Sequence, residues 1–186
     1  MSLALFIISA LSAGSILVLS LVAHFSRRIQ FWPPPDGKSW QHWTFKALFR
    51  GFLYPLLILT YLEFDLQTHP QRLFQYAAGI AMLVIGFGLT FLITFNMGWR
   101  NAFGEKRGLN TDGWFAHSRN PIYAATWLGL TGWALIVPSP YVGPLLALWA
   151  ALYLLAPFLE EPWLEEQYGD AYRIYKKSVP RFFFRF

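Results

Sequence analysis

The chain has 186 residues, of which 55% are hydrophobic and only 13% charged, and its formal net charge is +5. An average soluble domain carries about a quarter charged residues, so this sequence has too little polar surface to cover a water-soluble globule of its size. The high hydrophobic content also excludes intrinsic disorder. The sequence contains no cysteine, which excludes disulfides, thiolate metal sites and a cysteine nucleophile. The composition therefore predicts a single membrane domain over residues 1–186.

Five apolar stretches approach the length of about 20 residues that a membrane-spanning helix needs. They cover residues 3–23, 47–64, 73–97, 122–137 and 141–159. The last two stretches are separated only by Pro138-Ser139-Pro140, and the first of this pair is short. We therefore expect an all-α integral membrane protein with about five transmembrane helices, the last two forming a helical hairpin.

Lysine and arginine residues are distributed asymmetrically along this pattern of spans. If the N-terminus lies outside, 14 of the 15 basic residues fall on the cytoplasmic side and only Arg72 lies outside. Basic residues favour cytoplasmic loops, so the distribution predicts an outside N-terminus and a cytoplasmic C-terminus. It also accounts for the isoelectric point near 9.6 without a nucleic-acid partner, which would require a basic patch on a soluble fold.

The loop after the first apolar stretch is rich in proline and tryptophan. It contains Trp32 followed by three prolines, and then Trp40 and Trp43. Proline disfavours a helix here, and tryptophan is the usual anchor at the level of lipid headgroups. We interpret this segment as an interfacial loop, and a role in shaping a lipid entrance is the alternative.

Polar and ionisable residues concentrate in two stretches, 99–123 and 160–181. The predicted hairpin would return both stretches to the same cytoplasmic level, although they lie about 40 residues apart. Ionisable residues next to membrane spans mark functional sites, so we expect a site at the membrane surface. No metal-ligand spacing, glycine-rich phosphate loop or G-x-S-x-G motif occurs, and we expect neither a metal nor a soluble nucleotide-binding fold.

The first polar stretch has the pattern of a helix start. Thr111-Asp112-Gly113 is typical of a turn, Ser118 or Asn120 suits the N-cap, and Pro121 suits the first helical position. A helix N-terminus also offers free N–H groups to an anion such as a carboxylate. Arg119 beside it could bind the same carboxylate through two hydrogen bonds, or it could instead snorkel to the membrane interface.

The second polar stretch begins with two adjacent carboxylates, Glu160 and Glu161, directly after the fifth apolar stretch. A solvated helix end would explain them without any further function. Pro162 permits a bend, or it begins a separate C-terminal cytoplasmic helix. Four residues that follow at helical spacing form one largely aromatic face, which is typical of packing as well as of a cofactor wall. They are Leu164, Tyr168, Tyr172 and Tyr175.

Together the two stretches resemble the isoprenylcysteine carboxyl methyltransferase and phospholipid methyltransferase superfamily. The matching residues are Arg119-Asn120-Pro121-Ile122-Tyr123, Glu160-Glu161-Pro162-Trp163-Leu164, Tyr168-Gly169, Tyr172, Tyr175 and Val179-Pro180-Arg181. The superfamily pattern is R-H-P-x-Y, a hairpin, E-E-x-x-L, a tyrosine-rich segment and a V-P-R-like end. Its histidine is Asn120 here, and asparagine keeps a hydrogen-bond donor and acceptor but does not titrate near neutral pH.

The resemblance implies an S-adenosylmethionine-dependent membrane methyltransferase whose lipophilic acceptor enters from the bilayer. Residues 101–186 would form the cofactor-binding core, and residues 1–100 would shape the acceptor pocket. Arg119 and Glu161 would be catalytic, Glu161 as the nearest base for an amine acceptor. Carried over by position, the cofactor-binding residues are Thr111, Gly113, Arg119, Asn120, Pro121, Tyr123, Glu160, Glu161 and Leu164.

Two other functions remain open from the sequence: an NADPH-dependent membrane reductase similar to the sterol reductases, and a non-enzymatic membrane scaffold. The acceptor of a methyltransferase also remains open, among a prenylated cysteine carboxylate, a phospholipid amine, a thiol and another lipid.

Overall fold

The computed structural model describes all residues except 27–29, 36, 67–68, 99–107 and 183–186. The described residues form helices and contain no strand, which confirms the predicted all-α class for this part of the chain. The elements are α1 (Ser2–Ser26), α2 (Trp40–Glu63), α3 (Pro70–Met97), the short 3-10 helix η1 (Gly113–Ala116), α5 (Pro121–Ile136) and α6 (Val142–Ser178).

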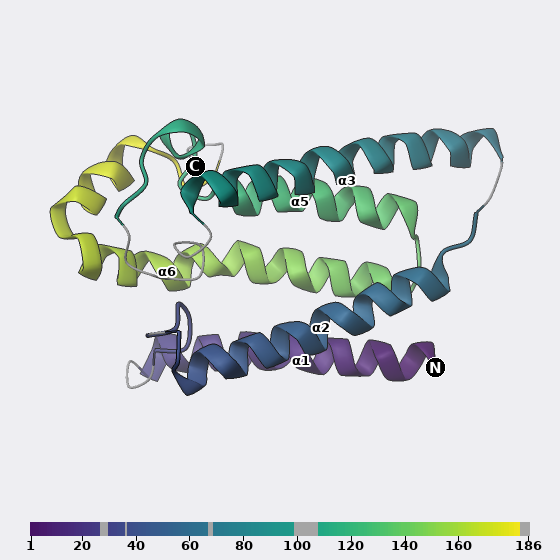
Figure 1. The fold of residues 1–186 in the computed structure, drawn as a ribbon, viewed down its shortest axis with the longest axis horizontal. Helices are drawn as coiled ribbons and strands as arrows, with labels where there is room; N and C mark the ends of the chain where they lie inside the picture. The colour runs from purple at the N-terminus through teal and green to yellow at the C-terminus, as the bar shows by residue number, and fades with distance from the viewer. Residues whose placement is uncertain (27–29, 36, 67–68, 99–107, 183–186) are drawn as a thin grey trace.

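The helices run back and forth along one long axis (Figure 1). Helices α1, α2, α3 and α6 are long and apolar enough to cross a membrane. Helix α5 has 16 residues, or about 24 Å at 1.5 Å per residue, which is shorter than the hydrocarbon core of about 30 Å. The α1–α2 connection, the segment before α5 and the C-terminal segment gather at one end of the molecule, which we call the polar end.

The predicted hairpin is confirmed, with α5 as its short first arm. Between α5 and α6, the Ser139 hydroxyl accepts hydrogen bonds from the backbone N–H groups of Tyr141 (3.1 Å) and Val142 (3.4 Å). The same hydroxyl donates to Glu63 at 2.9 Å and so connects the turn to the end of α2. Apolar side chains of α5 and α6, such as Trp133 and Leu145, share one core with α1 and α2.

Helices α3 and α5 pack closely because glycines face each other where they meet. A Cβ added to Gly86 of α3 would collide with the backbone of Gly129 and would lie 2.8 Å from the Ala125 carbonyl oxygen. One turn further along, Thr90 and Thr126 join the two helices through a hydroxyl hydrogen bond of 3.0 Å. Small residues that allow close helix contact are a common basis of packing in membranes. This contact sets the position of the N-terminus of α5.

We expect Gly86→Leu to destabilise the protein by about 3 kcal/mol, because the new side chain has no space between the two backbones. Gly88→Leu is the matched control, since nothing lies within 4 Å of a Cβ at Gly88 on the same helix. Thermal unfolding in detergent, followed by circular dichroism, measures both variants. Equal midpoints for the two variants would contradict the packing described for α3 and α5.

The expectation that a helix ends beside Glu160 and Glu161 is wrong. Helix α6 continues through Pro162, and its only non-helical residue is Gly169, with φ 52° and ψ −128°. A proline removes one backbone hydrogen bond, but only glycine adopts this positive φ without strain. The direction of the chain therefore changes at Gly169, and the last turns of α6 point back toward the start of α5 (Figure 1).

Candidate functional site

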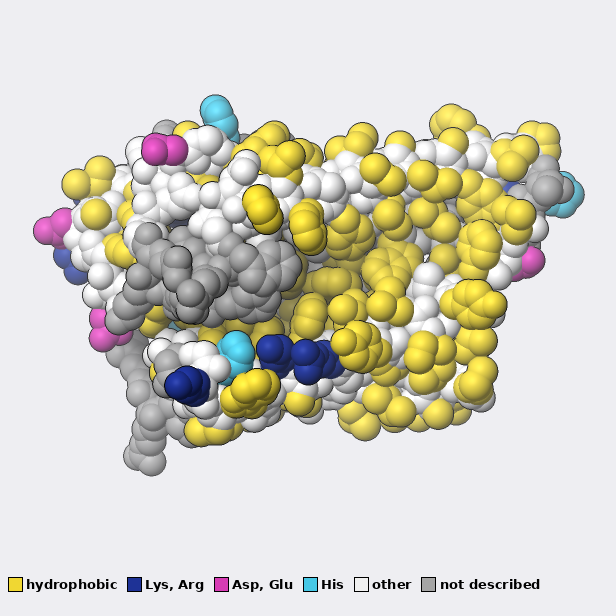
Figure 2. All heavy atoms as spheres, in the orientation of Figure 1, with side chains coloured by type: hydrophobic (Ala, Val, Ile, Leu, Met, Phe, Trp, Pro, Cys, Tyr) yellow, Lys and Arg dark blue, Asp and Glu magenta, His cyan; other side chains and the backbone are white. Residues whose placement is uncertain are grey.

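A cavity of about 390 Å³ lies among the helices and reaches the polar end, and its size is typical of a small-molecule site. All five α-helices line it, together with the α1–α2 connection and the segment before α5. Side chains from the middle of the helices, including Ile16, Phe52 and Trp149, make one part of the lining apolar. Figure 2 shows hydrophobic side chains covering α3 and α2 and continuing into the hollow between them.

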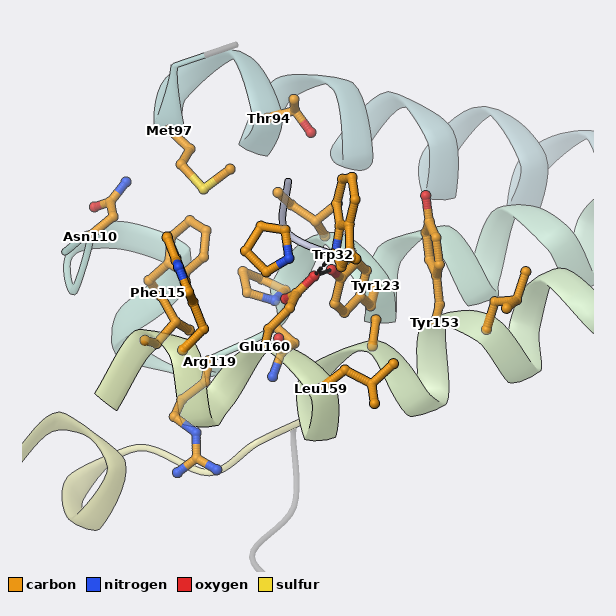
Figure 3. A pocket seen from close by; sticks show the side chains of 18 of the residues that line it. Trp32, Thr94, Met97, Asn110, Phe115, Arg119, Tyr123, Tyr153, Leu159 and Glu160 are labelled. Carbon is orange, nitrogen blue, oxygen red and sulfur yellow. Dashed lines mark hydrogen bonds between the residues drawn. The ribbon is translucent and has the colours of Figure 1, made fainter. Parts of the chain in front are cut away.

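Glu160 of α6 is a carboxylate in the lining of this cavity. Its Oε1 atom accepts hydrogen bonds from the Trp32 indole Nε1 (2.5 Å) and from the Tyr123 hydroxyl (2.6 Å). Figure 3 shows the three side chains converging. No described residue donates to Oε2, and no described Lys, Arg or His forms an ion pair with this carboxylate. A carboxylate in apolar surroundings without a counter-charge favours a cationic ligand.

Aromatic side chains surround the position of Glu160 and form a continuous series, which we call the aromatic wall. Successive members have ring centroids 4.2 to 6.0 Å apart. Aromatic faces attract cations, so the wall and the carboxylate favour the same charge. The wall consists of Trp32, Phe45, Phe49, Trp149, Tyr153 and Tyr123, all of which line the cavity.

Glu161 has a different environment from its neighbour Glu160, because adjacent positions on a helix point about 100° apart. Its side chain is 7% exposed, accepts from Arg119 at 2.8 Å and binds Arg181 through two hydrogen bonds of 2.8 Å. Lys176 lies 3.6 Å away. The bonds from Glu161 raise the pKa of the Arg181 guanidinium. Glu161 is therefore the acidic centre of an ion cluster beside the cavity.

Arg119 joins the start of α5 to the C-terminal segment. Its guanidinium donates through Nη1 to the carbonyl oxygens of Lys176 (2.7 Å) and Val179 (3.1 Å), and its backbone N–H donates to Pro180 at 2.9 Å. The guanidinium points away from Glu160 in Figure 3. The amide of Asn120 donates to the Arg181 carbonyl oxygen at 2.9 Å. These bonds hold residues 179–181 against the N-terminus of α5.

The predicted site residues fall into two groups. The two polar stretches do lie together, because the hairpin places Tyr123 against Glu160 and Arg119 against Glu161. Thr111, Gly113 and Glu161 are not in the cavity lining, and Gly113, with φ 59°, is the first residue of η1. The predicted residues that line the cavity are Arg119, Asn120, Pro121, Tyr123, Glu160 and Leu164.

The predicted aromatic face of α6 packs against the segment before α5 and also lines the cavity. Tyr172 and Tyr175 are buried, with Leu109 and Phe115 packed against them. The Tyr175 hydroxyl donates to the Phe115 carbonyl oxygen at 2.7 Å. The packing interpretation of this face is confirmed, and the same side chains line the cavity; their role as a cofactor wall stays a prediction.

Trp32 is the residue that the sequence assigned to a different environment. Its loop suggested an anchor in the lipid interface, yet the structure places its indole in the cavity and bonds it to Glu160, 128 positions later in the chain. Phe45 and Phe49 also line the cavity, although the sequence did not indicate this position for them. Neither local composition nor helical spacing reveals such a distant partner. The alternative, a role in shaping a lipid entrance, stays a prediction.

Comparison with protein-family models finds that residues 74–171 match the family described as phospholipid methyltransferase. The matched segment is just over half of the chain, and it includes α5, most of α6, Arg119, Tyr123 and Glu160. Comparisons with curated proteins and with solved structures give no match. Among the described residues, no group of three or more His, Asp or Glu side chains could hold a metal ion.

Proposed function

We propose, since the chain belongs to the phospholipid methyltransferase family, that it transfers the methyl group of S-adenosylmethionine to a lipophilic acceptor at the membrane surface. The family implies a membrane methyltransferase. The observation that supports the cofactor is the Glu160 carboxylate, which lines an aromatic cavity without a basic partner among the described residues. The resulting negative charge suits a cationic ligand and disfavours the anionic phosphates of NADPH.

The residues around Glu160 fit S-adenosylmethionine, whose amino and sulfonium groups are both positively charged. We assign the amino group to Glu160 Oε2 and the sulfonium to the aromatic wall through cation–π contact. The N-terminus of α5, where Pro121 and Ile122 line the cavity, would bind the carboxylate through free N–H groups. Leu164 and Asn120 complete the pocket. When bound, the cofactor supplies an electrophilic methyl group.

The contribution of the protein to this reaction is positioning and the exclusion of water. A displacement at a methyl carbon requires the acceptor atom in line with the bond that breaks, and a rigid pocket supplies that geometry. Carboxylate and thiolate acceptors need no strong base, whereas an ammonium acceptor must first lose a proton. Neither glutamate is assigned this proton, because both oxygens of Glu161 are bound by arginine and Glu160 is assigned to the amino group of the cofactor; an ammonium acceptor would release its proton to water. Arg119 and Glu161 then act by holding the pocket wall.

The acceptor would reach this site from the bilayer. The apolar part of the cavity lies at mid-helix positions of α1, α2 and α6, and the hollow between α3 and α2 in Figure 2 is lined by hydrophobic side chains. We place the polar end at the cytoplasmic surface, because the described parts of the predicted cytoplasmic loops and of the C-terminal segment lie there. In this arrangement the methyl donor enters from water and the acceptor from lipid.

Thermal unfolding with added ligands tests the proposed function against its alternatives. We expect S-adenosylhomocysteine to raise the unfolding midpoint, since a ligand present at 100 times its Kd stabilises the folded state by about 2.7 kcal/mol. NADPH should leave the midpoint unchanged. Stabilisation by NADPH alone would instead identify a reductase, and stabilisation by neither ligand would favour a scaffold. Transfer of labelled methyl groups to a total lipid extract, followed by mass spectrometry, would then identify the acceptor.

A further inference from the structure

We propose that Trp32 is a positioning residue of the cofactor site: its indole N–H fixes the carboxylate of Glu160, through which it acts. This inference rests on the proposed function and goes beyond it, because Trp32 lies outside the segment, residues 74–171, that matches the family. The N-terminal part of the chain would therefore complete the methyl-donor site as well as shape the acceptor pocket.

The orientation of Trp32 is fixed by its surroundings. Its ring stacks on Phe45 with a centroid distance of 4.2 Å and an interplanar angle of 28°. On either side along the chain, Phe31 is 1% exposed and Pro33 is buried. Phe31 also contacts Phe45 edge to face, with centroids 6.4 Å apart. The indole therefore presents its N–H to the cavity from a well-packed segment.

Neighbouring tryptophans show that this orientation is specific to Trp32. Trp40 and Trp43 follow in the same region of the chain, and each is 56% exposed on the outside of the protein. Their exposure is typical of interfacial anchors. An anchor has no need for a hydrogen bond to a carboxylate in a cavity, so the bond from Trp32 to Glu160 indicates a second role.

The hydrogen bond from Trp32 controls which oxygen of Glu160 remains available. Trp32 and Tyr123 both donate to Oε1, at 2.5 and 2.6 Å, from the α1–α2 connection and from α5. Two donors on one oxygen restrict rotation of the carboxylate and leave Oε2 for a ligand. With Tyr123 alone, the carboxylate can turn about a single bond. Hydrogen bonds to charged groups contribute enough that losing one weakens ligand binding about tenfold or more.

The test compares Trp32→Phe, which keeps an aromatic ring but removes the N–H donor, with Trp40→Phe as the matched control. We expect Trp32→Phe to weaken S-adenosylhomocysteine binding about tenfold and to raise the KM for S-adenosylmethionine similarly. The KM for the acceptor and kcat should stay within about twofold, because the lost bond acts on cofactor binding alone. Trp40→Phe should match the unsubstituted protein in every measurement.

A double-substitution cycle distinguishes positioning from a structural role. If Trp32 acts through Glu160, then Trp32→Phe combined with Glu160→Gln should bind no more weakly than Glu160→Gln alone. Additive losses would overturn the inference. Unchanged binding in Trp32→Phe would also overturn it, while binding by the unsubstituted protein would leave the proposed function standing. Failure of the unsubstituted protein to bind S-adenosylhomocysteine would overturn both.

A second variant covers the case in which Trp32→Phe does not fold. Phe45→Leu removes the ring that supports Trp32 but keeps the indole N–H, and we expect it to weaken S-adenosylhomocysteine binding about threefold. Ligand-induced stabilisation is measured against the unliganded midpoint of each variant, so a lower basal stability does not bias the comparison. Unchanged binding in Phe45→Leu would contradict the positioning role.

Discussion

Replacing Glu160 with glutamine is expected to weaken S-adenosylhomocysteine binding at least about 30-fold and to leave the fold intact. Glutamine keeps an oxygen that can accept from Trp32 and Tyr123, which now donate to Oε1 at 2.5 and 2.6 Å. It removes the negative charge that we assign to the amino group of the cofactor. Removing one partner of a desolvated charge pair costs about 2 kcal/mol or more.

Calorimetry with S-adenosylhomocysteine measures this loss, and size-exclusion chromatography with circular dichroism checks the fold. S-adenosylmethionine should lose affinity to a similar degree, because both molecules carry the amino group. A much larger loss for S-adenosylmethionine would show instead that Glu160 faces the sulfonium. Unchanged affinity for both ligands would remove Glu160 from the cofactor site.

Glu161→Gln, the same change one residue later, is expected to destabilise the protein by about 3 kcal/mol, because breaking a buried ion pair leaves its partners without a counter-charge. Glu161 binds Arg119, Arg181 and Lys176 within 4 Å, and the side chains of Glu161 and Arg119 are 7% and 9% exposed. Glu161 also orients Arg119, which donates to the carbonyl oxygens of Val179 and Pro180 and so holds the C-terminal segment against the start of α5. The C-terminal segment should therefore detach before the rest of the protein unfolds.

The unfolding midpoint in detergent, measured by circular dichroism, should fall by roughly 6–12 °C for a loss of this size. Glu166→Gln is the control, since Glu166 is exposed on the same helix. Limited proteolysis should release the C-terminal segment faster in Glu161→Gln than in the control. A midpoint equal to that of Glu166→Gln would show that the ion cluster contributes nothing to stability.

Much of the architecture follows from the sequence because it depends on local properties. The length of each apolar stretch predicts the helices, and Pro138-Ser139-Pro140 predicts the turn of the hairpin between α5 and α6. Pro121 marks the start of α5 as expected, since its missing N–H causes no loss at that position. The hairpin alone then requires that residues near Arg119 and near Glu160 meet at the polar end.

Local sequence properties do not show which of two helix-breaking residues changes the direction of the chain. Pro162 suggested the change of direction after the last span, but Gly169 makes it, because only the backbone angles distinguish a tolerated proline from a helix break. Ion pairing similarly directs the guanidinium of Arg119 to Glu161 and the C-terminal segment. A sequence motif identifies such residues without showing which way they point.

The composition and spacing of this sequence determined a helical membrane protein with a polar site beside a hairpin, because hydrophobic length and turn residues act over short distances. Only the tertiary structure decided that Glu160 faces the cavity while Glu161 faces the arginines, since a rotation of about 100° separates them on one helix. Only the tertiary structure brought Trp32 to Glu160 across 128 positions, because contacts between distant segments depend on how all the helices pack.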